Sequence, residues 1–207
     1  MGRIKGARNR DHQEARTGLI QAVTGPVLTA GGTPLSLRQL AKAADVDTAT
    51  LRHYFKDRRG LVQAVFESLL PFGAIHHNLA LELLVLPPEE AFTILLKRIC
   101  EGWATVLGGL HAVGFAEGMG DSELGHSYVS MILEPTLATF EVMLAHYHEK
   151  SFLYVPDVRV GSLGLAAPIV LALFHQYQLS GNRCRPLDLP SFVEAHVAAF
   201  LRGYANH

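Results

Sequence analysis

Hydrophobic positions between residues 36 and 59 repeat with the spacing of two short helices. In the second run, Leu51 and Phe55 are four residues apart and share one helical face. The polar segment 45–47 interrupts the pattern before that run. The pattern therefore predicts two short helices joined by a tight turn. The first helix has apolar residues at i, i+3, i+4 and i+7, namely Leu37, Leu40, Ala41 and Ala44.

Short polar side chains stand where these two helices are expected to begin and end. Ser36 precedes the first run and can accept a hydrogen bond from a backbone N–H of the first turn. Asp45 tolerates the left-handed backbone conformation better than most residues, which suits the end of a helix. Asp47 or Thr48 can cap the second helix, and the apolar side chain of Val46 can fill the gap between the helices.

The outward face of the second helix carries small or hydrogen-bonding side chains and no acid. Phosphates give affinity and base edges give specificity when a helix enters the DNA major groove. The pattern is therefore typical of a helix-turn-helix whose second helix contacts DNA. An ordinary helical hairpin with a solvated face is the alternative. The face comprises Thr48, Ala49, Thr50, Arg52, His53 and Tyr54, followed by the basic residues Lys56, Arg58 and Arg59.

The spacing within this segment resembles the DNA-binding signature of the tetracycline-repressor (TetR) family. The resemblance covers roughly residues 10–70, about a third of the chain. The run that carries it is Leu37-x-x-Leu40-Ala41-x-x-Ala44-x-Val46-Asp47-x-x-Thr50-Leu51-x-x-Tyr54-Phe55-x-x-Arg58-x-x-Leu61. The chain departs from the family pattern at the turn glycine, the cap Ser or Thr, a tyrosine, a histidine and a lysine, which are here Asp45, Asp47, Arg52, Tyr54 and Arg58.

The resemblance implies an all-α fold with an N-terminal three-helix DNA-binding domain, residues 1–60. Residues 61–207 would form a helical bundle for ligand binding and dimerisation. It implies a ligand-responsive regulator, expected to be a repressor, that binds a palindromic DNA operator as a homodimer through its last two long helices, about 158–179 and 190–204. Arg38, Thr48, Thr50, Arg52 and His53 would face bases or phosphates, and Tyr54, Lys56 and Arg58 would face the DNA backbone.

Prolines and glycines predict interruptions elsewhere in the helical pattern. A first helix over about 11–30 contains Gly25-Pro26, and a mid-helix proline costs about 3 kcal/mol, which predicts a kink or a break. A later helix beginning near Gly60 should bend or end at Pro71. The segment 108–125 holds six glycines, so we expect a helix over only part of it and a flexible connection over the rest. Pro135 is expected to interrupt a helix over 128–150.

Charge is divided unevenly along the 207 residues. Residues 1–60 contain eleven Lys or Arg and five acids, a net charge of +6, whereas the remainder carries −7. A strongly positive end points to a polyanionic partner, independently of the motif spacing. No continuous apolar run approaches the roughly 20 residues of a membrane span, so we expect a cytoplasmic protein without membrane contact. Cys100 and Cys184 have no CxxC spacing, and buried thiols are the simplest interpretation.

The resemblance also implies a small-molecule pocket inside the C-terminal bundle, for an effector that the sequence does not identify. Such pockets are mostly apolar with a few polar anchors. Plain core packing is the simpler interpretation of each candidate, because aromatic and Met residues at helical spacing usually pack. The candidates are Phe66, Trp103, Leu107, His111, Phe115, Met119, Met131, Phe140, Met143, Tyr147, Phe174 and His175.

Catalytic, cofactor and metal motifs are not recognisable in the sequence. Ser127 and Ser130 lack a nucleophile elbow, and adjacent or alternating histidines lie on different helical faces. Glu117, Asp121, Glu123 and His126 form at most a weak metal constellation, and solvated loop residues are the simpler interpretation. We therefore expect no enzyme and no cofactor. Two alternatives stay open: a small helical ligand-binding protein or enzyme without DNA function, and a dimeric scaffold for a protein partner.

Overall fold

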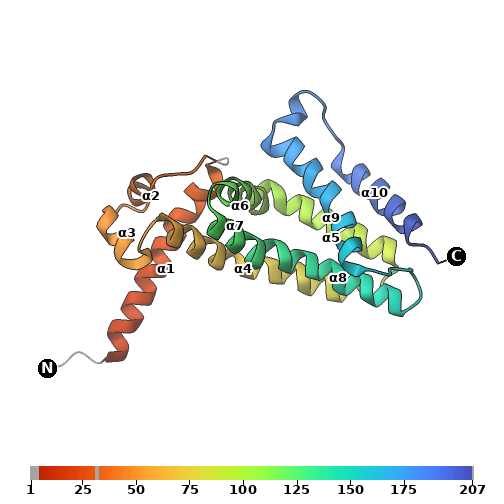
Figure 1. The fold of residues 1–207 in the computed structure, drawn as a ribbon, viewed down its shortest axis with the longest axis horizontal. Coiled ribbons are helices and arrows are strands. Elements are labelled where there is room, and N and C mark those ends of the chain that lie inside the picture. The colour runs from red at the N-terminus through yellow and green to blue at the C-terminus, as the bar shows by residue number, and fades with distance from the viewer. Residues whose placement is uncertain (1–4, 31–32, 207) are drawn as a thin grey trace.

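The computed structural model describes residues 5–30 and 33–206, which form helices and short connections (Figure 1). Within these residues the only β-pairing is one isolated bridge between Leu153 and Ala205, so the all-α prediction is confirmed. Three π-helical segments, Trp103–Leu107, Val129–Leu133 and Phe174–Gln178, continue helices that precede them. The α-helices are α1 (Lys5–Thr29), α2 (Leu37–Ala43), α3 (Thr48–Phe55), α4 (Arg58–Leu83), α5 (Pro88–Gly102), α6 (Gly108–Gly120), α7 (Ser122–Tyr128), α8 (Glu134–Glu149), α9 (Val158–Leu173) and α10 (Leu189–Gly203).

The turn between α2 and α3 has the caps that the sequence predicts. Ser36 and Gln39 form a capping box in which each side chain bonds the other residue's backbone N–H. Asp45 adopts the left-handed conformation with φ of 53°. The side chain of Asp47 accepts a hydrogen bond of 2.6 Å from the backbone N–H of Thr50. These contacts fix where α2 ends and α3 begins, and therefore how α3 is presented.

The helices do not break at two of the predicted places, because α1 continues through Pro26 and α4 continues through Pro71. A proline removes one hydrogen bond, to the carbonyl four residues earlier, but both helices hold buried residues on each side of it. Pro71 is exposed, and residues four apart share a helical face, so the carbonyl of Glu67 can bond water instead. As a result α4 runs unbroken from the N-terminal helices to the far end of the bundle (Figure 1).

The glycine-rich segment is also more regular than predicted, because α6 and α7 cover it except for Asp121. Asp121 caps α7 by accepting hydrogen bonds from the backbone N–H groups of Glu123 and Leu124. Gly114 leaves room for the ring of Tyr128, which occupies the position that a Cβ would need. Pro135 does not end the helix either: it directly follows the π-helical segment Val129–Leu133, inside the continuous helical stretch Ser122–Glu149.

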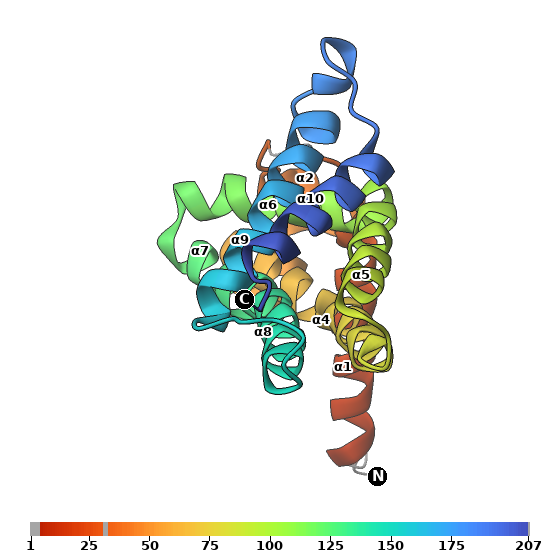
Figure 2. The same ribbon diagram turned by 90° about the vertical axis from the view of Figure 1, so that its right-hand side faces the viewer.

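Buried side chains form two separate hydrophobic cores. The N-terminal core joins α1–α3 and the first half of α4 to α6 and α7, and it includes Leu40, Leu51, Phe55, Leu61 and Phe66. The C-terminal core joins the second half of α4 to α5, α8, α9 and α10, whose end-on arrangement is seen in Figure 2. It includes Phe92, Leu95, Phe140, Tyr147 and Val197. The N-terminal core therefore extends beyond the predicted domain boundary at residue 60.

Two helical stretches, Ser122–Glu149 and Val158–Gln178, have the length and composition to span a membrane. The expectation concerned continuous apolar runs, whereas these stretches reach such lengths because π-helical turns join shorter apolar runs into continuous helices. Both stretches contribute side chains to the cores of the bundle. Cys100 is half-buried and burial raises the pKa of its thiol to about 11, whereas Cys184 is exposed, contrary to the prediction of two buried thiols.

Candidate nucleic-acid interface and ligand cavity

The outer surface of α3 carries an exposed stripe at positions i, i+3, i+4 and i+7: Ala49, Arg52, His53 and Lys56. Lys56 directly follows the helix. Leu51 and Phe55 are buried on the opposite side, as predicted. The stripe has a small side chain at its N-terminal end, a basic side chain at its C-terminal end and no acid. This composition suits a surface that approaches phosphates and base edges.

Other predicted DNA-binding residues surround this stripe. Arg38 is exposed on α2, and among the described residues no acid lies within ion-pair distance of Arg38, Arg52 or Lys56. Thr48, Thr50 and Tyr54 are half-buried.

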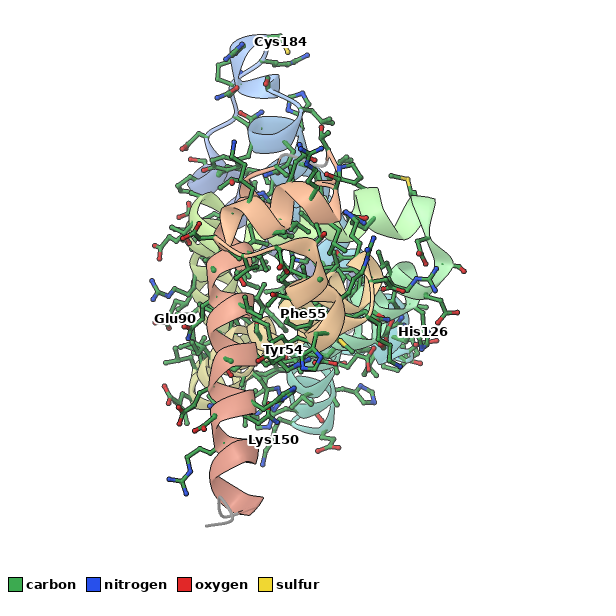
Figure 3. The ribbon with its side chains drawn as sticks, turned by 90° about the vertical axis from the view of Figure 1, so that its left-hand side faces the viewer. Tyr54, Phe55, Glu90, His126, Lys150 and Cys184 are labelled. Atoms are coloured by element: carbon green, nitrogen blue, oxygen red, sulfur yellow. The ribbon has the colours of Figure 1, made fainter. Side chains whose placement is uncertain are left out.

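The sequence interpretation missed His12, which α1 places beside α3. Its ring centroid lies 4.6 Å from that of Tyr54 and 5.8 Å from that of His53. Figure 3 shows Tyr54 and Phe55 where α3 packs beside α1. His12 falls on a helical segment without an apolar pattern at that point, so only the packing of α1 against α3 reveals it. It adds an exposed imidazole to the candidate interface.

Arg58 has a different position from the one predicted for a phosphate contact. Its guanidinium forms a two-pronged ion pair with Glu117 on α6, one prong being Nη1–Oε2 at 2.8 Å, and its Nε donates to the carbonyl of Leu35. The Arg58 side chain is 27% exposed and that of Glu117 is 9% exposed. Because its donors are bound within the protein, Arg58 ties α4 to α6 and to the segment before α2 rather than facing solvent.

Two neighbouring contacts join α4 to α7 in the same way. Arg59 donates from Nε to Asp121 Oδ2 at 2.8 Å, and Gln63 donates to the hydroxyl of Ser127 at 2.9 Å. Burial opposes ionisation of Asp121, but the hydrogen bonds from Arg59 and from backbone N–H groups outweigh it and lower the pKa of this carboxyl group. Glu117 and Asp121, predicted to be solvated, are thus occupied by arginines, and the described residues contain no cluster of three metal-ligating side chains.

A cavity of about 420 Å³ lies where the two cores meet. This volume falls within the roughly 300–1,000 Å³ typical of small-molecule sites. Its lining comes from α4, α5, α6, α8 and the two π-helical segments before α6 and α8, and it is mainly aliphatic and aromatic. The lining residues are Leu69, Leu70, Phe72, Gly73, Ala74, His76, His77, Leu95, Ile99, Leu107, Leu110, His111, Met131, Ile132, Pro135, Thr136, Ala138, Thr139 and Phe140.

The structure brings some of the predicted ligand residues to this cavity and places others elsewhere. His111, Met131, Phe140 and Leu107 line it. Phe66, Trp103, Met143 and Tyr147 are instead packed in the cores, because their helices turn these side chains toward neighbouring helices. Phe115 and Phe174 line a surface groove beside α9, and Met119 is 82% exposed. His175 packs against Gly181 and bonds Gln176, and Tyr147 donates to the carbonyl of Leu86 at 3.0 Å, so both have partners within the protein.

His111 is the most deeply buried of the three imidazoles in the lining. Its ring stacks on Trp103 with centroids 4.8 Å apart and planes 9° apart, and its Nδ1 lies 2.6 Å from the hydroxyl oxygen of Tyr128. Burial lowers the pKa of His111 to about 4 and raises the pKa of Tyr128. The imidazole is therefore neutral near pH 7, and its protonation would require a charge in an apolar environment.

His76 and His77 line the cavity but are not among the predicted ligand residues. As adjacent residues they point to different faces of a helix, which argues only against a shared metal site. Nδ1 of His76 lies 3.0 Å from the carbonyl oxygen of Phe72, and Nδ1 of His77 lies 3.2 Å from Oγ1 of Thr139. The signal that could have found them is two histidines within an otherwise apolar stretch of α4.

An apolar stripe on α9 lies exposed on the surface of the protomer. It follows helical spacing through Val160, Leu163, Gly164, Ala167 and Leu171, all of them exposed. Val160 is 59% and Leu171 68% exposed. The apolar groove beside α9 continues this surface. A contiguous apolar surface of this kind commonly marks a protein–protein interface.

Comparison with known proteins finds relatives by structure. No family model matches the chain, and no curated protein sequence matches it. A protein described as a TetR-family transcriptional regulator from Mesorhizobium loti superposes with a TM-score of 0.73 at 18% identity, over 94% of this chain and 98% of that one. Reduced NemR from E. coli gives 0.68 at 21% identity, over 90% and 97% of the two chains.

The transcriptional regulator FadR from Bacillus subtilis, solved in complex with stearoyl-CoA, gives a TM-score of 0.67 at 14% identity, over 90% of this chain and 98% of that one. These matches extend over nearly the whole of each protein, including both the α1–α3 unit and the bundle. They agree with the resemblance found in the segment from Leu37 to Leu61. The chain has the fold of the TetR-family transcriptional regulators.

Proposed function

We propose that this protein is a ligand-responsive transcriptional regulator that represses its target by binding a palindromic DNA operator as a homodimer. The observation that carries the proposal is the exposed, acid-free stripe on α3, which a left-handed turn and two helix caps present to solvent. Residues 1–60 bind DNA and residues 61–207 bind ligand and dimerise. The separation of charge along the chain supports the same assignment.

Within the DNA-binding unit, side chains divide by reach and chemistry. Arg52 and His53 extend from the exposed stripe and approach bases, with Thr48 and Thr50 at the start of the same helix. Arg38 and Lys56 flank the helix, and with Tyr54 they contact phosphates. We do not include Arg58 among the DNA contacts, because its donors are held by Glu117 and Leu35.

Dimerisation uses α9 and α10, which correspond to the predicted segments of about 158–179 and 190–204. The exposed apolar stripe of α9, with small residues Gly164 and Ala167 at its centre, allows a second copy of the helix to approach closely. An isologous interface of this kind has two-fold symmetry. The two α3 helices would then meet half-sites roughly 34–36 Å apart, one turn of DNA.

The effector is a small molecule that occupies the cavity between the two cores. One structure with this fold was solved with stearoyl-CoA, which supports a small-molecule ligand here. Filling a cavity at this seam favours one relative position of the N-terminal unit and the bundle over another. Ligand and operator then weaken each other's binding by the same factor. We place the protein in the cytoplasm, without membrane contact, because its partner is duplex DNA.

The test is fluorescence anisotropy of the purified protein with duplex DNA that flanks its own gene. We expect specific binding whose logarithmic affinity falls linearly with the logarithm of salt concentration. Lys56→Ala should reduce that slope by about 1, since it removes one phosphate contact. The matched control is Arg98→Ala, which removes an exposed arginine on α5 that pairs with Glu101.

Equal salt slopes for wild type, K56A and R98A would contradict the assigned phosphate contact. If the protein bound the flanking DNA no more tightly than unrelated duplex DNA, the proposal that it is a transcriptional regulator would be wrong. A protein that ignores DNA while retaining a small molecule would instead be a ligand-binding protein, the alternative that the cavity alone supports.

A further inference from the structure

We infer that the cavity takes an uncharged apolar molecule bearing a hydroxyl group, which the imidazoles of His77 and His111 recognise. The inference rests on the proposed function in one respect only, that the cavity is the effector site. It specifies the chemical class of effector, and it follows from the charges and hydrogen bonds of the lining.

Ionised side chains are missing from the described residues that line the cavity. The lining has no Lys, Arg, Asp or Glu, and its polar groups are three imidazoles and the hydroxyls of Thr136 and Thr139. Transfer of an unpaired carboxylate, phosphate or ammonium into such a site carries a desolvation cost that no opposite charge offsets. The lining therefore selects against charged molecules of either sign.

The hydrogen bond that His77 makes fixes the role of its other nitrogen. Thr139 donates its hydroxyl hydrogen to the carbonyl of Pro135 at 3.0 Å, so its oxygen accepts from Nδ1–H of His77. A neutral imidazole carries one hydrogen, and Nε2 of His77 is then a hydrogen-bond acceptor. His76 is fixed in the same way by the carbonyl of Phe72, which can only accept. The α4 side of the cavity thus offers acceptors.

His111 offers a hydrogen-bond donor, which complements the acceptors on α4. The hydroxyl hydrogen of Tyr128 has no acceptor among the described residues other than Nδ1 of His111, 2.6 Å from the oxygen. When Tyr128 donates to Nδ1, the single hydrogen of the neutral imidazole lies on Nε2. No described atom forms a hydrogen bond with this Nε2. The nitrogen is also not fully buried, since no fully buried side-chain nitrogen of the described residues lacks a partner. His111 is 7% exposed and lines the cavity, so its Nε2–H donates into the cavity.

A hydroxyl group matches this pair of imidazoles because it both donates and accepts. It can donate to Nε2 of His77 and accept from Nε2–H of His111, through one hydroxyl or through two at different positions. An ether or a ketone of the same size only accepts, so it leaves the acceptors of α4 without a partner. The rest of the molecule is apolar, since the remaining lining is almost entirely hydrocarbon.

The protein carries its own reporter for this test. Trp103 is the one tryptophan of the chain, is 2% exposed and stacks on His111. A hydroxyl that bonds His111 changes the environment of the indole, and aliphatic ligands do not absorb with it. Tryptophan fluorescence and isothermal titration calorimetry then give two independent dissociation constants.

The experiment titrates the full chain at pH 8 with four matched aliphatic probes. These are 1-octanol, its isomer 1-methoxyheptane, octanoate and octylammonium. We expect 1-octanol to bind about tenfold more tightly than the ether, the value of one net hydrogen bond. Octanoate and octylammonium should bind about a hundredfold more weakly than 1-octanol.

Variants assign the preference to the named imidazole. His77→Phe keeps a ring of similar size and removes the acceptor, so the preference for 1-octanol over the ether should fall to about twofold or less. The matched control is His126→Phe on α7, which replaces an exposed histidine outside the cavity and should keep the full preference (Figure 3). The comparison among probes on the wild-type chain stands even if a variant fails to fold.

Equal affinity for 1-octanol and 1-methoxyheptane, or tighter binding of octanoate or octylammonium, overturns the inference. An unchanged preference in H77F overturns the assignment to His77. These outcomes are separable from failure of the proposed function, because none of the measurements involves DNA. If the protein bound 1-octanol but no DNA, the proposed regulatory function would be wrong, whereas the inferred ligand preference of the cavity would stand.

Discussion

The two cores of this protein are held in place by different kinds of contact. The N-terminal core is bounded by a largely buried ion pair, Arg58 with Glu117, and by a buried hydroxyl, Ser127, that accepts from Gln63. Ion pairs around the C-terminal core are more exposed than this pair, as between Lys97 and Glu194. The C-terminal core instead depends on aliphatic and aromatic packing.

This difference indicates how the two regions respond to a ligand between them. A two-pronged arginine–carboxylate pair holds only in a narrow range of geometries, so the N-terminal unit has a defined position on α6 and α7. Apolar packing tolerates small shifts more readily than such a pair. The cavity lies at the seam, and α6 carries both a cavity residue, His111, and the ion-pair partner Glu117. A displacement of α6 therefore acts on the position of α4 and α3.

The most severe disruption of this arrangement should come from Gly114→Ala. The added Cβ overlaps the ring of Tyr128 and forces α6 and α7 apart, which should lower the free energy of unfolding by about 3 kcal/mol. Gly18→Ala on α1 is the matched control, because nothing lies within 4 Å of its added Cβ. That control should be stabilising by about 0.5–1 kcal/mol. Urea unfolding measures both, and equal values would show that α6 and α7 do not pack as described.

Removal of the buried carboxylate should have the next largest effect. Glu117→Ala leaves the guanidinium of Arg58 without its partner, and we expect a loss of about 2–3 kcal/mol, below the usual range for buried pairs because Arg58 is partly exposed. Glu101→Ala breaks an exposed pair with Arg98 and should change stability by about 0.5 kcal/mol or less. Urea unfolding measures both variants. Similar losses of unfolding free energy in the two would show that the buried ion pair contributes no more to stability than the exposed one.

Acid should lower the stability of the protein through His111, which lines the cavity between the two cores. Its pKa of about 4 in the folded state lies below the ordinary value, so the unfolded chain binds the proton more tightly. Stability should therefore be unaffected by this group above about pH 6.5 and should fall as the pH is lowered, by about 2 kcal/mol at pH 5. His111→Phe removes this dependence. Urea unfolding at pH 7 and pH 5 tests it, and identical losses in the two proteins would show that His111 is not buried and neutral.

Local patterns predicted the N-terminal unit well because its structure depends on near neighbours. The cap of α2 by Ser36, the left-handed Asp45, the cap of α3 by Asp47 and the inward Leu51 and Phe55 all involve contacts within a few residues. The same reasoning failed at Pro26 and Pro71, where packing on both sides of the proline outweighs one lost hydrogen bond.

The candidate sites divide in the same way. The exposed stripe on α3 follows from helical spacing alone, but His12 joins it from a different helix. Four of the twelve predicted ligand residues line the cavity, namely Leu107, His111, Met131 and Phe140. Helical spacing shows that a residue faces inward, yet it does not show whether the neighbouring helix leaves space there.

The sequence by itself determined the two short capped helices with their tight turn and the positive charge of the N-terminal unit, because helix periodicity, caps and charge are local or additive properties. Its resemblance to the TetR family implied the all-α class. Only the tertiary structure decided that Arg58 meets Glu117, 59 positions away, and that His76 and His77 share a cavity with His111. These contacts depend on how helices distant along the chain pack together, and residue spacing carries no information about that distance.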